Sequence, residues 1–92
     1  MRWIKEPDLP AFMYIYLNKI EDAEAATWTE KEKNAGYKEF HRLLDLARDN
    51  TSDIVEKCIR IIKETRHIVE YELWCKIVYF MQDYIKGETV WG

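Results

Sequence analysis

Apolar residues recur at helical spacing along three stretches of the chain. This pattern predicts an all-α bundle of three helices, at about residues 9–26, 30–48 and 53–86. In the first stretch, Asp8 supplies an N-cap side chain, and Pro10 falls in the first turn, where its missing N–H costs nothing. The predicted apolar face of this helix consists of Phe12, Met13, Ile15, Tyr16, Leu17 and Ile20.

The second predicted helix has the clearest start signal in the chain. Thr29 and Glu32 are spaced as in a capping box, in which each side chain accepts a hydrogen bond from a backbone N–H of the first turn. Apolar residues then recur every three or four positions, at Tyr37, Phe40, Leu44 and Ala47. A run of turn-forming residues at 49–53 predicts a short connection after this helix.

The third stretch contains no proline or glycine, but its apolar face changes direction halfway along. The first half has one apolar stripe, formed by Ile54, Cys58, Ile61, Ile62, Thr65, Ile68 and Val69. If the helix continued, Glu72, Lys76 and Asp83 would occupy the same side in the second half. Two other apolar stripes replace it, with centres about 120° apart on a regular helix. One contains Leu73, Ile77, Phe80 and Tyr84, and the other contains Tyr71, Trp74, Val78, Met81 and Ile85.

So wide an apolar surface must be covered on two sides, which leaves two interpretations. Either the segment breaks near residues 67–72 and makes a four-helix domain, or it forms one helix of about 50 Å that a second copy covers. The second stripe has the spacing of a coiled-coil seam, and aromatic side chains and Met are enriched in interfaces. We therefore predict a homo-oligomer with its interface at Tyr71, Trp74, Val78, Met81 and Ile85.

Length and charge narrow the class of protein. The 92 residues leave room for one helical domain, residues 1–92, and 14 basic against 17 acidic residues give a net charge of −3. This charge argues against a general nucleic-acid binder. The longest apolar run, residues 10–17, is far shorter than the roughly 20 residues that span a membrane. The N-terminus lacks the basic start of a signal peptide, so we expect a cytoplasmic protein without membrane contact, with Cys58 and Cys75 reduced.

No motif in the sequence is specific for catalysis or for a cofactor. His41 and Asp45 lie one helical turn apart, as do Glu64 and His67, but two ligands without a third do not define a metal site. A glycine-rich phosphate loop and a paired cysteine motif are both absent from the sequence. We therefore predict a protein that is not an enzyme and that holds no metal or cofactor.

Two charged surfaces are candidates for contact with a partner. A basic stripe opposite the apolar face of the third stretch consists of Arg60, Lys63, Arg66 and His67, and it suits phosphates or an acidic partner. An acidic group near the end of the first helix consists of Glu21, Asp22 and Glu24, whose charges oppose the helix dipole. Both patterns are also typical of solvated helix faces.

These observations predict a non-enzymatic interaction or regulatory protein, a homo-oligomer that binds and modulates another macromolecule. Small phage-type inhibitors share this size and this absence of motifs, which is an analogy only. The alternative is a nucleic-acid-binding regulator that uses the basic stripe together with lysines near the start of the second helix. A third interpretation is a small-ligand binder with an aromatic-lined cavity between its helices.

Overall fold

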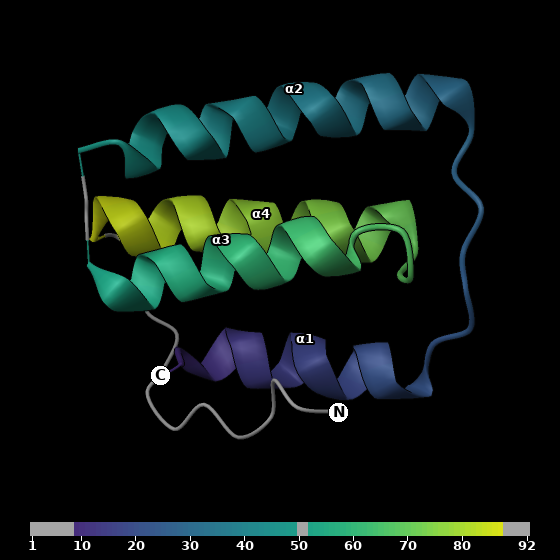
Figure 1. Ribbon diagram of the computed structural model, residues 1–92, viewed down its shortest axis with the longest axis horizontal. Coiled ribbons are helices and arrows are strands. Elements are labelled where there is room, and N and C mark those ends of the chain that lie inside the picture. Colours follow the sequence, from purple (N-terminus) through teal and green to yellow (C-terminus); the bar gives the residue numbers. More distant parts are fainter. Residues whose placement is uncertain (1–8, 50–51, 88–92) are drawn as a thin grey trace.

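A computed structural model describes residues 9–49 and 52–87 of the chain. These residues form helices and connections and contain no strand, so the predicted all-α class is confirmed. The prediction of a three-helix bundle is wrong, because the described residues form four helices (Figure 1). The helices are α1 (Ala11–Asp22), α2 (Glu30–Ala47), α3 (Asp53–Thr65) and α4 (Tyr71–Lys86).

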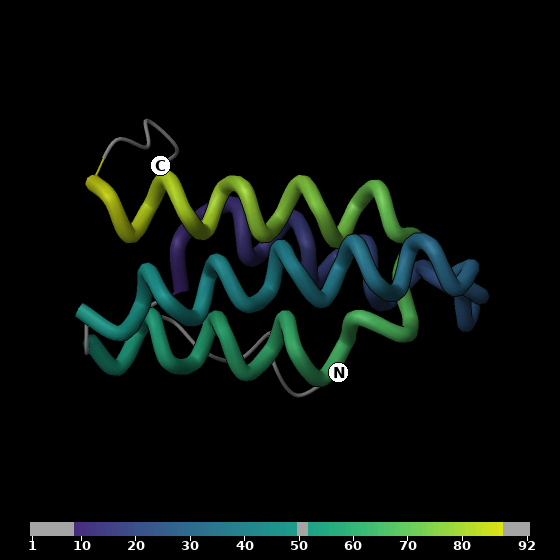
Figure 2. The backbone as a smooth tube through the Cα atoms, turned by 90° about the horizontal axis from the view of Figure 1, so that it is seen from above, coloured from purple at the N-terminus to yellow at the C-terminus, as the bar shows by residue number. Residues whose placement is uncertain are grey.

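Each helix runs antiparallel to the one before it, and α4 lies in contact with all three others. In Figure 1, α2 and α1 lie on opposite sides of α4, and α3 lies in front of it. The view from above shows that α3 and α4 flank the α1 and α2 pair on opposite sides (Figure 2). Because consecutive helices are antiparallel, the connection between α1 and α2 and the turn between α3 and α4 lie at the same end of the bundle (Figure 1).

The segment predicted as the third helix folds back on itself. It leaves the helix after Thr65, turns through residues 66–70, and resumes as α4 at Tyr71. The reversal lets both apolar faces of the segment point into one core, which a straight helix could not do because those faces point in different directions. The stripe of the first half and both stripes of the second half contribute to this core, as Ile62, Ile77 and Val78 illustrate.

The first helix is shorter than predicted. It begins at Ala11 and ends at Asp22, and Ala23 has an extended backbone, so the residues up to 26 belong to a connection. Pro10 occupies the cap position without a side-chain hydrogen bond, and Asp8, the predicted cap, lies outside the described residues. The predicted apolar face packs into the core except for Ile15, which is exposed.

The start of α2 agrees with its sequence signal. The Thr29 hydroxyl accepts a hydrogen bond from the backbone N–H of Glu32 at 3.2 Å, and the Glu32 carboxylate accepts one from the Thr29 N–H at 2.8 Å. The capping box therefore provides acceptors for two backbone N–H groups that have no partner within the helix itself. It also fixes where α2 begins, immediately after Trp28.

A buried hydrogen-bond pair joins α1 to α3. The Thr65 hydroxyl donates to the Ile61 carbonyl at 2.6 Å, and the Tyr16 hydroxyl lies 2.8 Å from the Thr65 Oγ1. Because Thr65 has used its only hydroxyl proton, Tyr16 is the donor of the second bond. Burial raises the pKa of Tyr16 to about 12.

Replacing Tyr16 with phenylalanine is expected to lower the free energy of unfolding by about 1 kcal/mol at pH 7. Above pH 10, the unfolded protein loses the Tyr16 proton while the folded protein keeps it, so the wild type loses stability as pH rises toward 12. At pH 11, the free energy of unfolding of the wild type is lower by about 1.4 kcal/mol for this reason, and the variant does not show this decrease. Urea unfolding of both proteins at pH 7 and pH 11 measures the difference, and parallel pH dependence would contradict it.

Candidate functional site

A cleft of about 290 Å³ opens between the first half of α2 and the end of α3. We name it the Trp28–Arg66 cleft. Its walls come from four separate parts of the chain: the connection before α2, α2 itself, the turn after α3, and α4. The residues that line it are Ala26, Trp28, Lys33, Gly36, Tyr37, Arg66, His67 and Trp74.

Gly36 packs directly against the aromatic wall of this cleft. A Cβ atom at this position would lie 3.1 Å from Cζ3 of Trp28 and 3.3 Å from Cζ3 of Trp74, closer than ordinary van der Waals contact. The missing side chain therefore lets α2 approach both indole rings closely. The two rings meet edge to face, with their centroids 5.4 Å apart.

Trp28 ties the two connections at this end of the bundle together. Its indole N–H donates a hydrogen bond to the Val69 carbonyl, at 2.8 Å, in the turn between α3 and α4. The ring also lies edge-on against Tyr71, with centroids 5.4 Å apart. The cleft wall therefore depends on a contact between residues 41 positions apart in the sequence.

The outer wall of the cleft combines an aromatic ring with a positive charge. Tyr37 is 56% exposed, and the guanidinium carbon of Arg66 lies 5.6 Å from the centre of its ring. The His41 ring, about one turn further along α2, lies beside Tyr37, with the two ring centroids 5.7 Å apart. A cation over a tyrosine ring is attracted by the ring's electrons, so Arg66 is held at the cleft before any ligand arrives.

Apart from the phenol of Tyr37, the ionisable side chains that line the Trp28–Arg66 cleft are basic. They are Lys33 from α2 and Arg66 and His67 from the turn after α3. The net charge of the whole chain is −3, so this basic lining runs against the overall balance. A basic rim around apolar walls favours a ligand that is both anionic and partly apolar.

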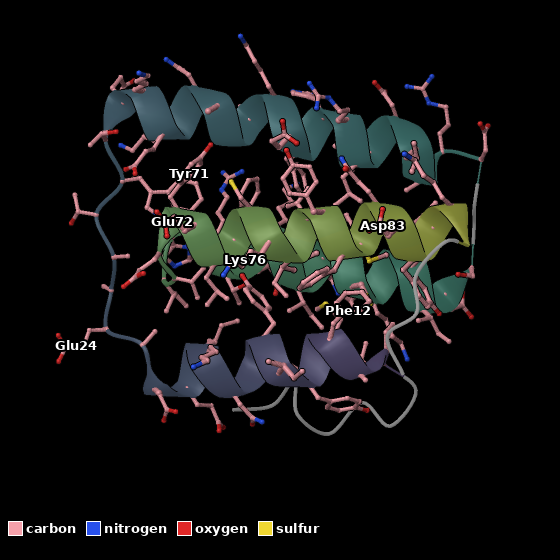
Figure 3. All side chains as sticks on the ribbon, turned by 180° about the vertical axis from the view of Figure 1, so that it is seen from behind. Phe12, Glu24, Tyr71, Glu72, Lys76 and Asp83 are labelled. Carbon is pink, nitrogen blue, oxygen red and sulfur yellow. The ribbon has the colours of Figure 1, made fainter. Side chains whose placement is uncertain are left out.

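A second cleft, of about 240 Å³, has the opposite charge. Trp28 and Ala26 line both clefts, while the charged residues of the second are Glu32, Glu70 and Glu72. Figure 3 shows Glu72 on the outward face of α4, near Tyr71, which points toward α2. Because like charges repel one another, the Arg66 side of Trp28 is the more favourable side for an acidic ligand.

The environment of the two cysteine thiols favours their protonated form. Burial raises the pKa of the Cys58 thiol to about 12. Burial also raises the pKa of the Cys75 thiol; the hydrogen bond with Tyr71 lowers it, while the negative charges of Glu39, Glu32 and Glu72 raise it further. A nucleophilic cysteine is favoured by the opposite shift, toward the thiolate. Among the described residues, no group of three or more His, Cys, Asp or Glu side chains is arranged to hold a metal ion.

The structure divides the predicted basic stripe. Arg66 and His67 line the Trp28–Arg66 cleft, whereas Arg60 and Lys63 lie exposed on α3 and do not line it. Arg66 is half-buried and points toward Tyr37 on α2. Only the C-terminal end of the stripe contributes to the cleft, where it is joined by Lys33 of another helix.

The predicted oligomer seam lies largely inside the core of one chain. Trp74, Val78 and Met81 are each at most 1% exposed, and Tyr71 and Ile85 are half-buried. Folding back at residues 66–70 covers the apolar surface that led us to expect a second copy. In this fold, the three buried side chains are not accessible to a partner, and oligomerisation itself stays a prediction.

The predicted acidic surface is exposed. Glu21 and Asp22 lie in the last turn of α1, and Glu24 lies in the connection that follows, where Figure 3 shows it away from the bundle. None of the three lines either cleft. The row Glu72, Lys76 and Asp83 is exposed on the outward face of α4, the direction that their positions in the sequence predict (Figure 3).

Comparison of this chain with models of protein families, with curated proteins and with solved structures found no match. Within the described ranges, no helix is both long enough and apolar enough to span a bilayer. The described residues form an antiparallel four-helix bundle with a basic, aromatic cleft at one end.

Proposed function

We propose that the protein is a non-enzymatic interaction protein that binds an acidic segment of another protein in the Trp28–Arg66 cleft. The observation that carries the proposal is the lining of the cleft, which joins exposed aromatic surface to basic side chains only. Modulation of the bound partner and a cytoplasmic location, both expected from the sequence, belong to this proposal.

The residues of the cleft are of the types that dominate binding energy at protein interfaces. Trp, Tyr and Arg are enriched among the few residues whose truncation costs most. Trp28, Tyr37 and Arg66 all line this site. Arg66 is held over the Tyr37 ring, and Trp28 is held by its hydrogen bond to the Val69 carbonyl. A preorganised site loses less side-chain entropy on binding, which supports useful affinity from a small contact area.

A protein partner is favoured over a nucleic acid by the distribution of charge. A nucleic acid needs a continuous track of positive charge along its phosphates. Here, Arg60 and Lys63 do not line the cleft, and the acidic residues Glu32, Glu70 and Glu72 line the second cleft, which shares Trp28 with the first. Phosphates that followed the surface past Trp28 would therefore meet Glu32 and Glu70.

To test the proposal, peptides are selected from a displayed random library for binding to the wild-type protein. We expect the selected peptides to carry net negative charge and to bind at least tenfold more weakly to the Lys33→Glu and Arg66→Glu variants, measured by fluorescence anisotropy. Lys38→Glu is the matched control, because Lys38 is exposed on the same helix as Lys33 and does not line the cleft. It should leave binding within twofold of wild type.

Three results would contradict the proposal. The first is a set of selected peptides without net negative charge. The second is an equal loss of binding in Lys38→Glu and Lys33→Glu, which would mean that overall charge and not the cleft decides. The third is tight, salt-sensitive binding of oligo(dT) or oligo(U) that Arg66→Glu abolishes, which would assign the cleft to single-stranded nucleic acid.

A further inference from the structure

Three basic side chains border one small volume in the Trp28–Arg66 cleft. Lys33 comes from α2, while Arg66 and His67 come from the turn after α3, so the three belong to two separate parts of the chain. Among the described residues that line this cleft there is no Asp or Glu to neutralise them. Each of the three can donate a hydrogen bond, since even a neutral imidazole keeps one N–H. The lining therefore presents several donors, and more than one positive charge, to a single ligand group.

The indole rings of the cleft contribute apolar wall and no free donor. The Trp28 N–H donates to the Val69 carbonyl at 2.8 Å, and the Trp74 N–H donates to the Ile62 carbonyl at 3.4 Å. Apolar walls lower the local dielectric constant, which strengthens the attraction between the basic side chains and an anion. The charge of a ligand group in this cleft is therefore balanced by the basic side chains and not by the rings.

The size of the cleft limits how many acidic groups enter it. A volume of about 290 Å³ lies at the lower end of the range for small-molecule sites, roughly 300–1,000 Å³, and suits a single side chain. One carboxylate brings one negative charge, and the planar fork of an arginine can take both of its oxygens as a bidentate pair. A single carboxylate would therefore balance Arg66 and leave Lys33 without an anionic partner.

A phosphorylated side chain matches this lining more closely. A phosphate monoester carries about 1.5–2 negative charges at pH 7 and three acceptor oxygens, so it can pair with an arginine fork and with further donors at once. The guanidinium carbon of Arg66 already lies 5.6 Å from the centre of the Tyr37 ring, which holds the fork at the cleft. Recognition of phosphorylated segments by clustered basic side chains is a general mode of peptide binding.

We infer that the acidic group bound in the Trp28–Arg66 cleft is a phosphorylated side chain of the partner protein, contacted by Lys33, Arg66 and His67. The inference rests on the proposed function and specifies its ligand: a phosphate monoester in place of a carboxylate. Binding of the partner then depends on its phosphorylation, because the unmodified side chain brings no charge to the cleft.

The test uses fluorescein-labelled nine-residue peptides that share one aspartate on either side of a central position. That position is serine, phosphoserine, tyrosine, phosphotyrosine or aspartate, and a sixth peptide has a central aspartate and one more aspartate at its end, which matches the net charge of the phosphopeptides. At pH 7.5, we expect at least one phosphopeptide to bind tenfold or more tighter than both aspartate peptides, measured by anisotropy. The serine and tyrosine pairs then distinguish a short stem from an aromatic one.

Variants of the protein locate the phosphate. Lys33→Gln and Arg66→Gln are each expected to reduce the advantage of the phosphopeptide over the charge-matched aspartate peptide to threefold or less. Arg66→Lys keeps the charge but loses the fork, so it should fall between Arg66→Gln and wild type. Lys63→Gln is the matched control, because Lys63 is exposed on α3 and does not line the cleft, and it should leave the advantage within twofold. If Arg66→Gln does not fold, Lys33→Gln decides, since Lys33 is exposed.

The outcomes separate this inference from the function on which it rests. Phosphopeptides that bind no better than the charge-matched aspartate peptide, with binding of both still lost in Arg66→Glu, would overturn the phosphate and leave the acidic-segment function standing. An equal loss of the phosphopeptide advantage in Lys63→Gln and Lys33→Gln would also overturn the inference, because the phosphate would then not be bound in the cleft. Failure of every peptide to bind, combined with library peptides that ignore Arg66→Glu, would overturn both.

Discussion

Replacing Trp74 with alanine is expected to lower the free energy of unfolding by about 3–5 kcal/mol, the cost of truncating a fully buried tryptophan. Trp74 is 1% exposed, and it contacts Trp28 and Phe40 while its N–H donates to the Ile62 carbonyl. Its side chain therefore joins α4 to α2, to α3 and to the connection before α2. A domain of this size is stable by only about 5–14 kcal/mol, so the variant loses a large part of that total.

Urea unfolding followed by circular dichroism measures this loss. Trp74→Phe is the matched comparison, because it keeps an aromatic ring and removes only the hydrogen bond and part of the volume, so it should fall between wild type and alanine. Tyr79→Ala serves as the surface control, because Tyr79 is a large side chain on the same helix that is 53% exposed. A loss below about 1 kcal/mol in Trp74→Ala would show that the core does not depend on this residue.

Replacing Trp28 with alanine is expected to have two large effects at once. It removes the ring that lines the Trp28–Arg66 cleft and the hydrogen bond to the Val69 carbonyl. Because Trp28 is half-buried, we expect a stability loss of about 2–4 kcal/mol, somewhat below that of a fully buried tryptophan, of which about 1 kcal/mol belongs to the hydrogen bond. Binding of the acidic peptides selected from the library should fall at least tenfold.

Trp28→Phe separates these effects. It keeps an aromatic wall but cannot donate to Val69, so it should lose about 1 kcal/mol of stability and retain most of the binding. Urea unfolding and anisotropy titration at a temperature where the variants remain folded measure the two quantities separately. Full binding by Trp28→Ala, in a protein shown to be folded, would contradict the assignment of the cleft.

Part of the fold follows from local sequence. The capping box of Thr29 and Glu32 marks the start of α2, because its hydrogen bonds join residues only three positions apart. The outward direction of Glu72, Lys76 and Asp83 also follows from helical periodicity, since charged side chains remain in water. The all-α class and the approximate place of each helical segment were predictable for the same reason.

The break at residues 66–70 is different, because no proline or glycine marks it. The periodicity of the segment showed that its apolar face changed direction, but a second copy and a fold-back both accounted for that change. Tertiary contacts decide between them in this structure: Trp28 donates to the Val69 carbonyl, and the Tyr16 hydroxyl bonds to Thr65 at the end of α3. Both partners are more than 40 positions away in the sequence.

The Trp28–Arg66 cleft has no local sequence signal for the same reason. The sequence alone identified Arg66 and His67 as members of a basic stripe. It did not show that Gly36 and Tyr37 would be their neighbours. Helix caps and periodicity depend on residues within one or two turns, so the sequence by itself determined the all-α class, the start of α2 and the outward face of α4. The cleft needs side chains from four segments to meet, and only the packing of helices against one another, driven by burial of apolar surface, brings them together.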